Sequence, residues 1–102
     1  PIYVAVNEED VCMGYAFCQV KEQPFSNNMV QFQSLFIDDL CVDRFARGQH
    51  IGESLFDYVK QEAKRMGCYE VTLNVWAGNI SAEKFYEKMG MKTKERQLEY
   101  IL

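Results

Sequence analysis

A strand-like run leads directly through a glycine-bearing turn into an amphipathic helix, and this succession restricts the fold more than any other feature of the chain. Residues 30–42 are rich in the aromatic and branched side chains that favour strands. After the turn, apolar residues recur every four positions, at Ile51, Leu55, Val59 and Ala63. That spacing places one apolar stripe along a helix. A strand followed by such a helix predicts an α/β fold with a right-handed crossover.

The end of this helix is also marked in the sequence. Phe56 and Met66 widen the apolar stripe. Lys64 and Arg65 fall in the last turn, where positive charge suits the C-terminal end of the helix dipole. Gly67 can adopt the left-handed conformation that commonly ends a helix, so we expect the helix to stop there.

The rest of the chain predicts further elements of both kinds. Alternating or branched residues predict strands at residues 2–6, 11–20, 69–75 and 97–102, and a second helix is predicted at residues 81–89. Residues 21–28, which contain Pro24, are typical of a surface loop. No linker or repeat divides the sequence. We therefore expect residues 1–102 to form a single domain, with one sheet packed against helices.

Composition limits the classes of protein to consider. A length of 102 residues with 48% hydrophobic content suits one globular domain. The net charge of −4 and the pI near 4.9 argue against a protein that coats nucleic acid or an acidic membrane. No apolar run approaches the ~20 residues that span a bilayer. The chain begins at Pro1 rather than at a methionine, so we expect its numbering to start inside a longer protein or after processing.

The cysteines do not form a recognisable metal site. Cys12, Cys18, Cys41 and Cys68 are widely spaced and are accompanied by a single histidine. Without a Cys-x-x-Cys pair or a Cys/His cluster, we expect no zinc site. We expect reduced thiols in a cytoplasmic protein rather than a disulfide pair.

The turn before the first helix has the chemistry of an anion site. Gly48 allows a tight turn and Gly52 allows close approach, while the first-turn amides of the helix lack intrahelical acceptors that a phosphate would supply. Arg47 adds a charge that can chelate phosphate oxygens. An ordinary strand-to-helix loop with two glycines explains the same residues. Neither a P-loop nor a Gly-x-Gly-x-x-Gly pattern is present.

A second segment, residues 79–91, helps to decide between an anion site and an ordinary loop. It carries Asn79, Ala82, Phe85, Tyr86 and Gly90. This run is similar to the Asn-x-x-Ala-x-x-Phe-Tyr-x-x-x-Gly-Phe signature of the GNAT superfamily of acyl-CoA-dependent N-acetyltransferases, with Met91 where phenylalanine is usual. Residues 47–52 resemble the pyrophosphate loop of that superfamily, Arg/Gln-x-x-Gly-x-Gly/Ala, and the two motifs occur in the same order.

The resemblance implies the GNAT fold, a mixed and mostly antiparallel sheet with splayed central strands and flanking helices. It also implies an N-terminal truncation, because a first strand and two helices that usually help to form the acceptor pocket are missing ahead of Pro1. His50 stands where the loop pattern has its first glycine. Its amide can donate to phosphate if φ at His50 is negative. We expect the His50 side chain to face solvent or lie beside the phosphates rather than to act in catalysis.

The activity implied by the resemblance is transfer of the acetyl group of acetyl-CoA to a primary amine of a small molecule or peptide, by direct attack and without a metal. The strand residues Leu40, Cys41 and Val42 would lie along the pantetheine arm and offer backbone hydrogen bonds to it and to the acyl carbonyl. The pyrophosphate would be held by the loop residues Arg47, Gly48, Gln49, His50, Ile51, Gly52 and Glu53.

Tyr86 matches the usual general acid of the superfamily, a phenol that returns a proton to the departing thiolate. A phenol is protonated at neutral pH and can donate. A core aromatic residue on one face of the second helix is the other explanation of Tyr86. Asn79 would bind the pantetheine arm, cap the second helix, or do both.

The general base is less clearly marked. Asp38 and Asp39 alternate faces of the strand beside the acyl site, so only one of them can point towards it, and we favour Asp38. A water chain or a carboxylate from elsewhere would serve equally well, with Asp38 or Asp39 binding a cationic acceptor. Cys41 has no adjacent histidine to activate it, which favours direct transfer over a covalent intermediate.

The partner that these residues predict is an amine acceptor of unknown identity, without nucleic acid or membrane, and a homodimer is left open. Trp76, with Tyr69, Phe85 and Tyr100, is predicted to pack in the core or at an interface rather than to stack on bases. Two alternatives from other classes remain. One is a non-catalytic acyl-CoA-binding or regulatory module, and the other is a structural partner that pairs its open sheet edge with another chain.

Overall fold

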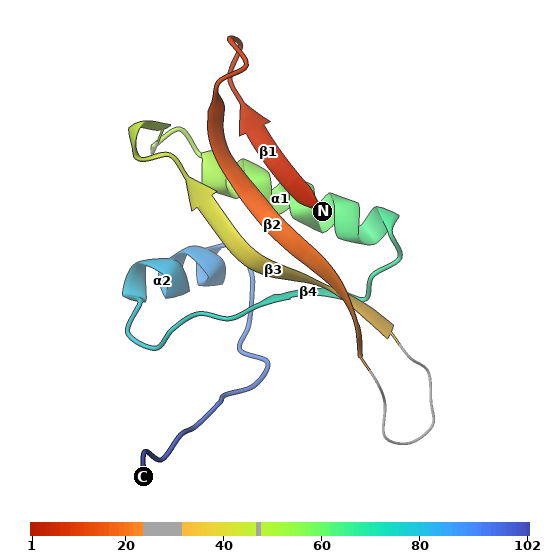
Figure 1. Ribbon diagram of the computed structural model, residues 1–102, viewed down its shortest axis with the longest axis vertical. Coiled ribbons are helices and arrows are strands. Elements are labelled where there is room, and N and C mark those ends of the chain that lie inside the picture. The colour runs from red at the N-terminus through yellow and green to blue at the C-terminus, as the bar shows by residue number, and fades with distance from the viewer. Residues whose placement is uncertain (24–31, 47) are drawn as a thin grey trace.

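The computed structural model describes residues 1–23, 32–46 and 48–102, which form a sheet with two helices (Figure 1). The first part of the chain holds strands β1 (Ile2–Val6), β2 (Cys12–Gln23) and β3 (Phe32–Val42) and the 3-10 turn η1 (Arg44–Ala46). Helix α1 (Ile51–Arg65), strand β4 (Glu70–Leu73) and helix α2 (Ile80–Lys88) follow. The α/β class predicted from the sequence is confirmed, with small shifts in the boundaries.

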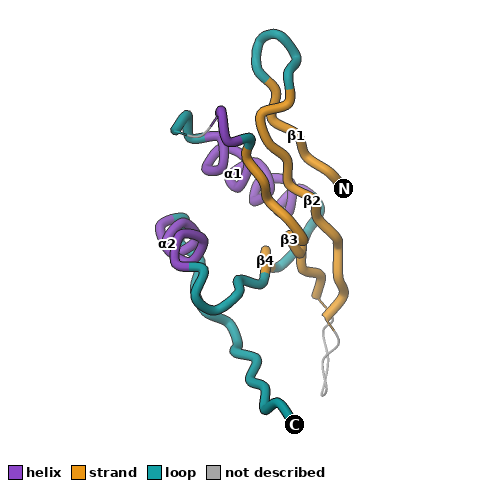
Figure 2. The backbone as a smooth tube through the Cα atoms, turned by 60° about the vertical axis from the view of Figure 1, so that its left-hand side comes forward, coloured by secondary structure: helices purple, strands orange, loops and turns teal. Residues whose placement is uncertain are grey.

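The sheet is mixed and mostly antiparallel, as expected. Its order is β1-β2-β3-β4, with β1, β2 and β3 antiparallel and β4 parallel to β3. The parallel pairing ends where Ile37 meets Leu73, although β3 continues to Val42. The far end of β3 is therefore unpaired on its β4 side, which matches the predicted splay. Figure 2 shows α1 and α2 on the same side of the strands.

The core lies between α1 and the sheet. The apolar stripe that the four-residue spacing predicted is buried, and it packs on small and branched side chains of β2 and β3. The buried residues of this cluster are Ala16, Cys18, Leu35, Ile37, Phe56, Val59 and Ala63. Each large side chain buried in this way contributes about 1.5–3 kcal/mol. Gly67, with φ +78°, ends this helix in the left-handed conformation that its position predicted.

Two irregularities shape the end of β3. In the pairing with β2, Phe17 faces Asp39 and Cys18 faces Ile37, which leaves Asp38 as the extra residue of a β-bulge. Nearby, Gly14 of β2 lies so close to β3 that a Cβ atom there would be 2.8 Å from the carbonyl oxygen of Cys41. Gly14 thus allows β2, β3 and the start of α1 to converge.

The predicted loop at residues 21–28 begins later than expected, because Lys21 to Gln23 continue β2 by pairing with β3. The rest of that loop and the start of the strand predicted at residues 30–42 lie outside the described residues. Helix α2 begins and ends one residue before the predicted bounds.

The strand predicted at residues 97–102 is wrong. The alternation is present in the sequence, but this segment has no strand partner in the described chain, and backbone groups without a ladder partner remain solvated. Its large apolar side chains are exposed, as are Tyr69 and Trp76 beside β4. Tyr69, Trp76 and Tyr100 therefore do not pack in the core, and their packing at an interface, which the sequence left open, stays a prediction. Phe85 does pack between the helices. In the described part of the chain, neither helix has the length and apolar character needed to cross a membrane.

Candidate active site

The loop that joins η1 to α1 turns through two left-handed residues. Gly48 has φ +87° and His50 has φ +60°, and α1 begins at the next residue, Ile51. The negative φ assumed for His50 is therefore wrong. A left-handed conformation costs a non-glycine residue about 1–2 kcal/mol, and the glycine usual at this point would avoid that cost. Arg47 lies outside the described residues.

The start of α1 leaves donors available for an anion. The amides of its first turn have no intrahelical acceptor, and the His50 side chain does not cap them. These amides and the positive end of the helix dipole point out of the N-terminus. The first-turn amides of α1 therefore have no side-chain cap, and anion binding at this loop stays a prediction.

Glu53 places a negative charge near the amides at the start of α1. Its Oε1 accepts a hydrogen bond of 2.7 Å from Nζ of Lys88 on α2, and its Oε2 lies 3.3 Å from Nδ1 of His50. The bond from Lys88, with a smaller contribution from His50, lowers the pKa of Glu53. Its carboxylate is therefore anionic and already paired. Lys88 is a site residue that sequence reasoning missed, because its partner lies on a different helix.

Two shallow hollows adjoin each other along the end of β3. The first has a volume of about 320 Å³ and lies beside the loop. Its lining residues are Val42, Gly48, His50, Ile51, Gly52, Glu53 and Phe85. The second, of about 370 Å³, runs along α2. Its lining residues are Leu40, Val42, Gly52, Asn79, Ser81, Ala82, Phe85 and Tyr86. The hollows share Val42, Gly52 and Phe85, so they form one groove from the α1 N-terminus to Tyr86.

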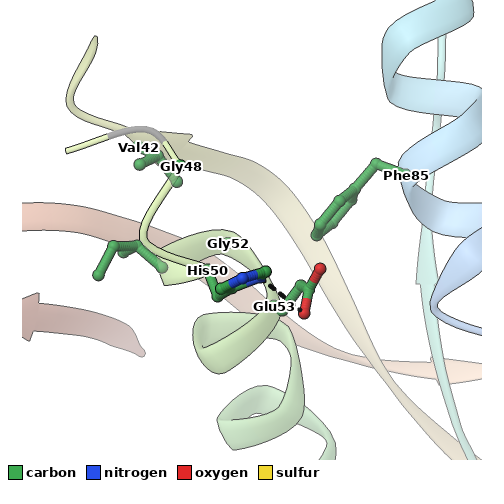
Figure 3. A pocket seen from close by; sticks show the side chains of 7 residues that line it. Val42, Gly48, His50, Gly52, Glu53 and Phe85 are labelled. Carbon is green, nitrogen blue, oxygen red and sulfur yellow. Dashed lines mark ion pairs between the residues drawn. The ribbon is translucent and has the colours of Figure 1, made fainter. Parts of the chain in front are cut away.

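Phe85 divides the two hollows and packs against the start of α1. Figure 3 shows its ring reaching from α2 towards Gly52 and Glu53. A Cβ atom at Gly52 would lie 3.4 Å from the Phe85 ring and 3.6 Å from Val42. The close approach that Gly52 allows is therefore made by Phe85 and Val42 in this structure.

Tyr86 is half-buried at the far end of the groove. Its ring lies 6.0 Å from that of Phe56 and 5.0 Å from that of Phe85, both in edge-on arrangements. Burial, and then the charge of Asp39, raise the pKa of Tyr86 above its ordinary value. The phenol is accordingly protonated at neutral pH and able to donate. The core explanation of Tyr86 is confirmed, since its ring packs on the core. Tyr86 also lines the second hollow, and its role as the general acid stays a prediction.

Asn79 caps helix α2. Its Oδ1 accepts a hydrogen bond of 3.3 Å from the amide of Ala82, which confirms the capping role predicted from its position. Asn79 also lines the second hollow, so its amide group is available beside a bound molecule there.

The two aspartates of β3 lie outside the lining of both hollows. At the bulge, Oδ2 of Asp38 accepts a hydrogen bond of 2.7 Å from Gln19. Oδ2 of Asp39 accepts one of 2.8 Å from the hydroxyl of Tyr15. Tyr15 and Gln19 were missed by the sequence reasoning, because strand alternation alone does not show which residues become neighbours across a bulge.

Cys41 and Gln49 are exposed and do not line either hollow. All four cysteines are described, and each is a thiol without a disulfide bond. Among the residues that the structure describes, no group of His, Cys, Asp and Glu side chains is arranged to hold a metal ion.

Several known proteins are similar to this chain. A glucosamine 6-phosphate N-acetyltransferase from Arabidopsis thaliana is 36% identical over 62 residues, which are 61% of this chain and 40% of that relative. The solved structure of a mutant protein from Bacillus halodurans is 29% identical with a TM-score of 0.89, and the match covers 99% of this chain and 64% of that chain. The crystal structure of the glucosamine-6-phosphate N-acetyltransferase from Arabidopsis thaliana is 26% identical with a TM-score of 0.77, covering 98% of this chain and 65% of that chain.

The chain thus spans about two fifths of the length of the curated relative and less than two thirds of the similar solved chains. A sequence model of the Acetyltransferase (GNAT) family matches residues 1–91, which is most of the chain. On this match, supported by the splayed sheet and the groove between α1 and α2, the chain belongs to the GNAT acetyltransferase family.

Proposed function

We propose that this protein transfers the acetyl group of acetyl-CoA to a primary amine of a small molecule or peptide. The observation that carries the proposal is the groove formed by the two adjoining hollows. It leads from the free amides at the start of α1, past the end of β3 that has no β4 partner, to Tyr86 on α2. Membership of the GNAT family supports acetyl-CoA as the donor.

The chain's own residues fit a donor that carries a pyrophosphate and an extended arm. The α1 amides, with Gly48 and Gln49, would hold the pyrophosphate, and Arg47 would add its charge. Glu53 would take part only through its amide, because its carboxylate is paired with Lys88. Leu40, Cys41 and Val42 would offer backbone groups to the arm, since β3 has no β4 partner beyond Ile37.

Tyr86 would act as the general acid. Its raised pKa keeps the phenol protonated, so it can donate a proton to a thiolate that leaves from the second hollow. Asn79 would orient the arm while it caps α2. Holding the amine and the thioester together in the groove supplies the proximity on which such direct attack depends.

The base role that the sequence favours for Asp38 stays a prediction. Asp38 lies on the bulge with Gln19, while the charge of Asp39 acts on Tyr86. Replacing each aspartate by asparagine and recording kcat/KM against pH separates them. Loss of the acidic limb of the profile in Asp38→Asn alone supports Asp38, and loss in Asp39→Asn alone overturns that assignment.

The acceptor and the cellular setting belong to the same proposal. The curated relatives are named glucosamine 6-phosphate N-acetyltransferases, so glucosamine 6-phosphate is the first acceptor to test in a wider amine panel. We treat residues 1–102 as part of one catalytic domain. The four free thiols suit a reducing compartment such as the cytoplasm.

Two measurements test the function. Calorimetry with acetyl-CoA asks whether the groove binds the donor, and a thiol-release assay across the amine panel asks whether the acetyl group is transferred. Binding together with turnover that falls in Tyr86→Phe supports the proposal. Binding without turnover on any amine favours the non-catalytic module, and no binding refutes the donor assignment.

A further inference from the structure

Helix α2 carries Tyr86, yet few contacts attach it to the rest of the described chain. None of its residues is fully buried. Its apolar contacts with α1 include those of Phe85 at Gly52 and of Tyr86 at Phe56. Within the described ranges, the pair formed by Lys88 and Glu53 is the sole ion pair between the two helices.

We propose that this ion pair is a positioning contact that holds α2 against the first turn of α1 and thereby sets the place of the Tyr86 hydroxyl. The inference rests on the proposed function, in which Tyr86 donates the proton. Lys88 lies one turn beyond Phe85 on α2, and their partners Glu53 and Gly52 are neighbours on α1. One ionic and one apolar contact, made by Lys88 and Phe85, thus join the two helices on either side of Tyr86 in the sequence.

The charges of Lys88 and Glu53 should also affect the binding of acetyl-CoA. Glu53 lines the hollow in which the pyrophosphate would lie, so its carboxylate repels an anion there unless it is neutralised. Lys88 supplies that neutralisation at 2.7 Å, and His50 approaches the other oxygen at 3.3 Å. Removing Lys88 and removing the Glu53 charge should therefore have opposite effects on the KM for acetyl-CoA, although both break the positioning contact.

The opposite effects on KM give a test that the ion pair would fail if its role were only structural. Lys88→Met and Glu53→Gln are both expected to lower kcat, by up to roughly fivefold for a partly exposed pair. Lys88→Met raises the KM for acetyl-CoA, whereas Glu53→Gln lowers it. The double variant loses no more kcat than either single one, because both changes remove the same contact.

A matched control and a substrate-free readout complete the test. Lys60→Met breaks an ion pair of 3.2 Å that lies within α1, and it should leave kcat and KM as they are. Hydrogen exchange without substrate should show faster exchange of the α2 amides in the Lys88 and Glu53 variants, with no change in Lys60→Met.

The outcomes separate this inference from the proposed function. Unchanged α2 exchange in both single variants overturns the positioning contact, whatever the activity. Faster exchange with unchanged kcat in an active enzyme overturns its link to Tyr86. A wild-type protein that releases no thiol from acetyl-CoA refutes the proposed function and with it the role of Tyr86, while hydrogen exchange still decides whether the pair fastens α2.

Discussion

Replacing Gly14 by alanine should destabilise the fold and weaken donor binding together. The new Cβ atom would lie 2.8 Å from the Cys41 carbonyl oxygen, 3.1 Å from Cδ1 of Leu55 and 3.3 Å from Cγ2 of Ile51. The Leu55 and Ile51 side chains can rotate away, but the carbonyl belongs to the backbone of β3, so β2 and β3 must separate locally. Overpacking of this kind costs about 1–3 kcal/mol. For a domain of this size, that lowers the melting temperature by about 4–8 °C for each kcal/mol.

Urea unfolding followed by circular dichroism measures the stability, and calorimetry with acetyl-CoA measures the effect on the loop that precedes Ile51. Gly67 is the matched control, because it is also a glycine but has open space around it and a φ of +78°. Serine should cost more than alanine at Gly14, where volume matters, whereas the two should cost the same at Gly67, where only the backbone is strained. A Gly14→Ala protein within about 0.5 kcal/mol of wild type would refute the reasoning.

Three further predictions concern single side chains. Asp39→Asn should lower the pKa of Tyr86 without returning it to the ordinary value, because burial is the larger cause of the shift and remains; an NMR titration of the Tyr86 ring measures this. Asn79→Ala should cost about 1 kcal/mol through the lost cap of α2, which urea unfolding detects, while Ser81→Ala is the control. Burial by itself would raise the pKa of Glu70, but the hydrogen bonds from Lys94 and Ser34 hold it below its ordinary value. Its stabilisation is therefore present above the unfolded-state pKa and is lost as the pH falls through the folded-state pKa, and Glu70→Gln should flatten this acid limb in unfolding curves.

The sequence predicted most successfully where local rules decide the structure. The apolar spacing of α1 reports which face is buried, and Gly67 and Asn79 mark helix ends through their own conformational preferences. The motif around Tyr86 placed that residue in the groove because its spacing from Asn79 fixes both on one side of α2.

Other features depend on neighbours that are distant in the sequence. The strand predicted at residues 97–102 has the right alternation, but a strand forms only where another strand pairs with it. The partners of Asp38 and Asp39 are set by a bulge, and that of Glu53 by the docking of a second helix. The left-handed His50 did have a signal in the sequence, because a glycine is usual at that position of the loop.

Two glycines show how a missing side chain lets parts of the fold approach one another. At Gly14 the missing side chain lets a backbone oxygen of β3 and two side chains of α1 lie 2.8, 3.1 and 3.3 Å from the place of a Cβ atom, so this glycine affects how closely β2, β3 and α1 pack. At Gly52 the nearest atom would be at an ordinary contact distance of 3.4 Å, and it belongs to a side chain, Phe85, that can move. Gly52 therefore affects the space shared by the two hollows but does not determine the fold. Neither effect can be predicted from the pattern of apolar and polar residues, because both arise where elements from different parts of the chain meet.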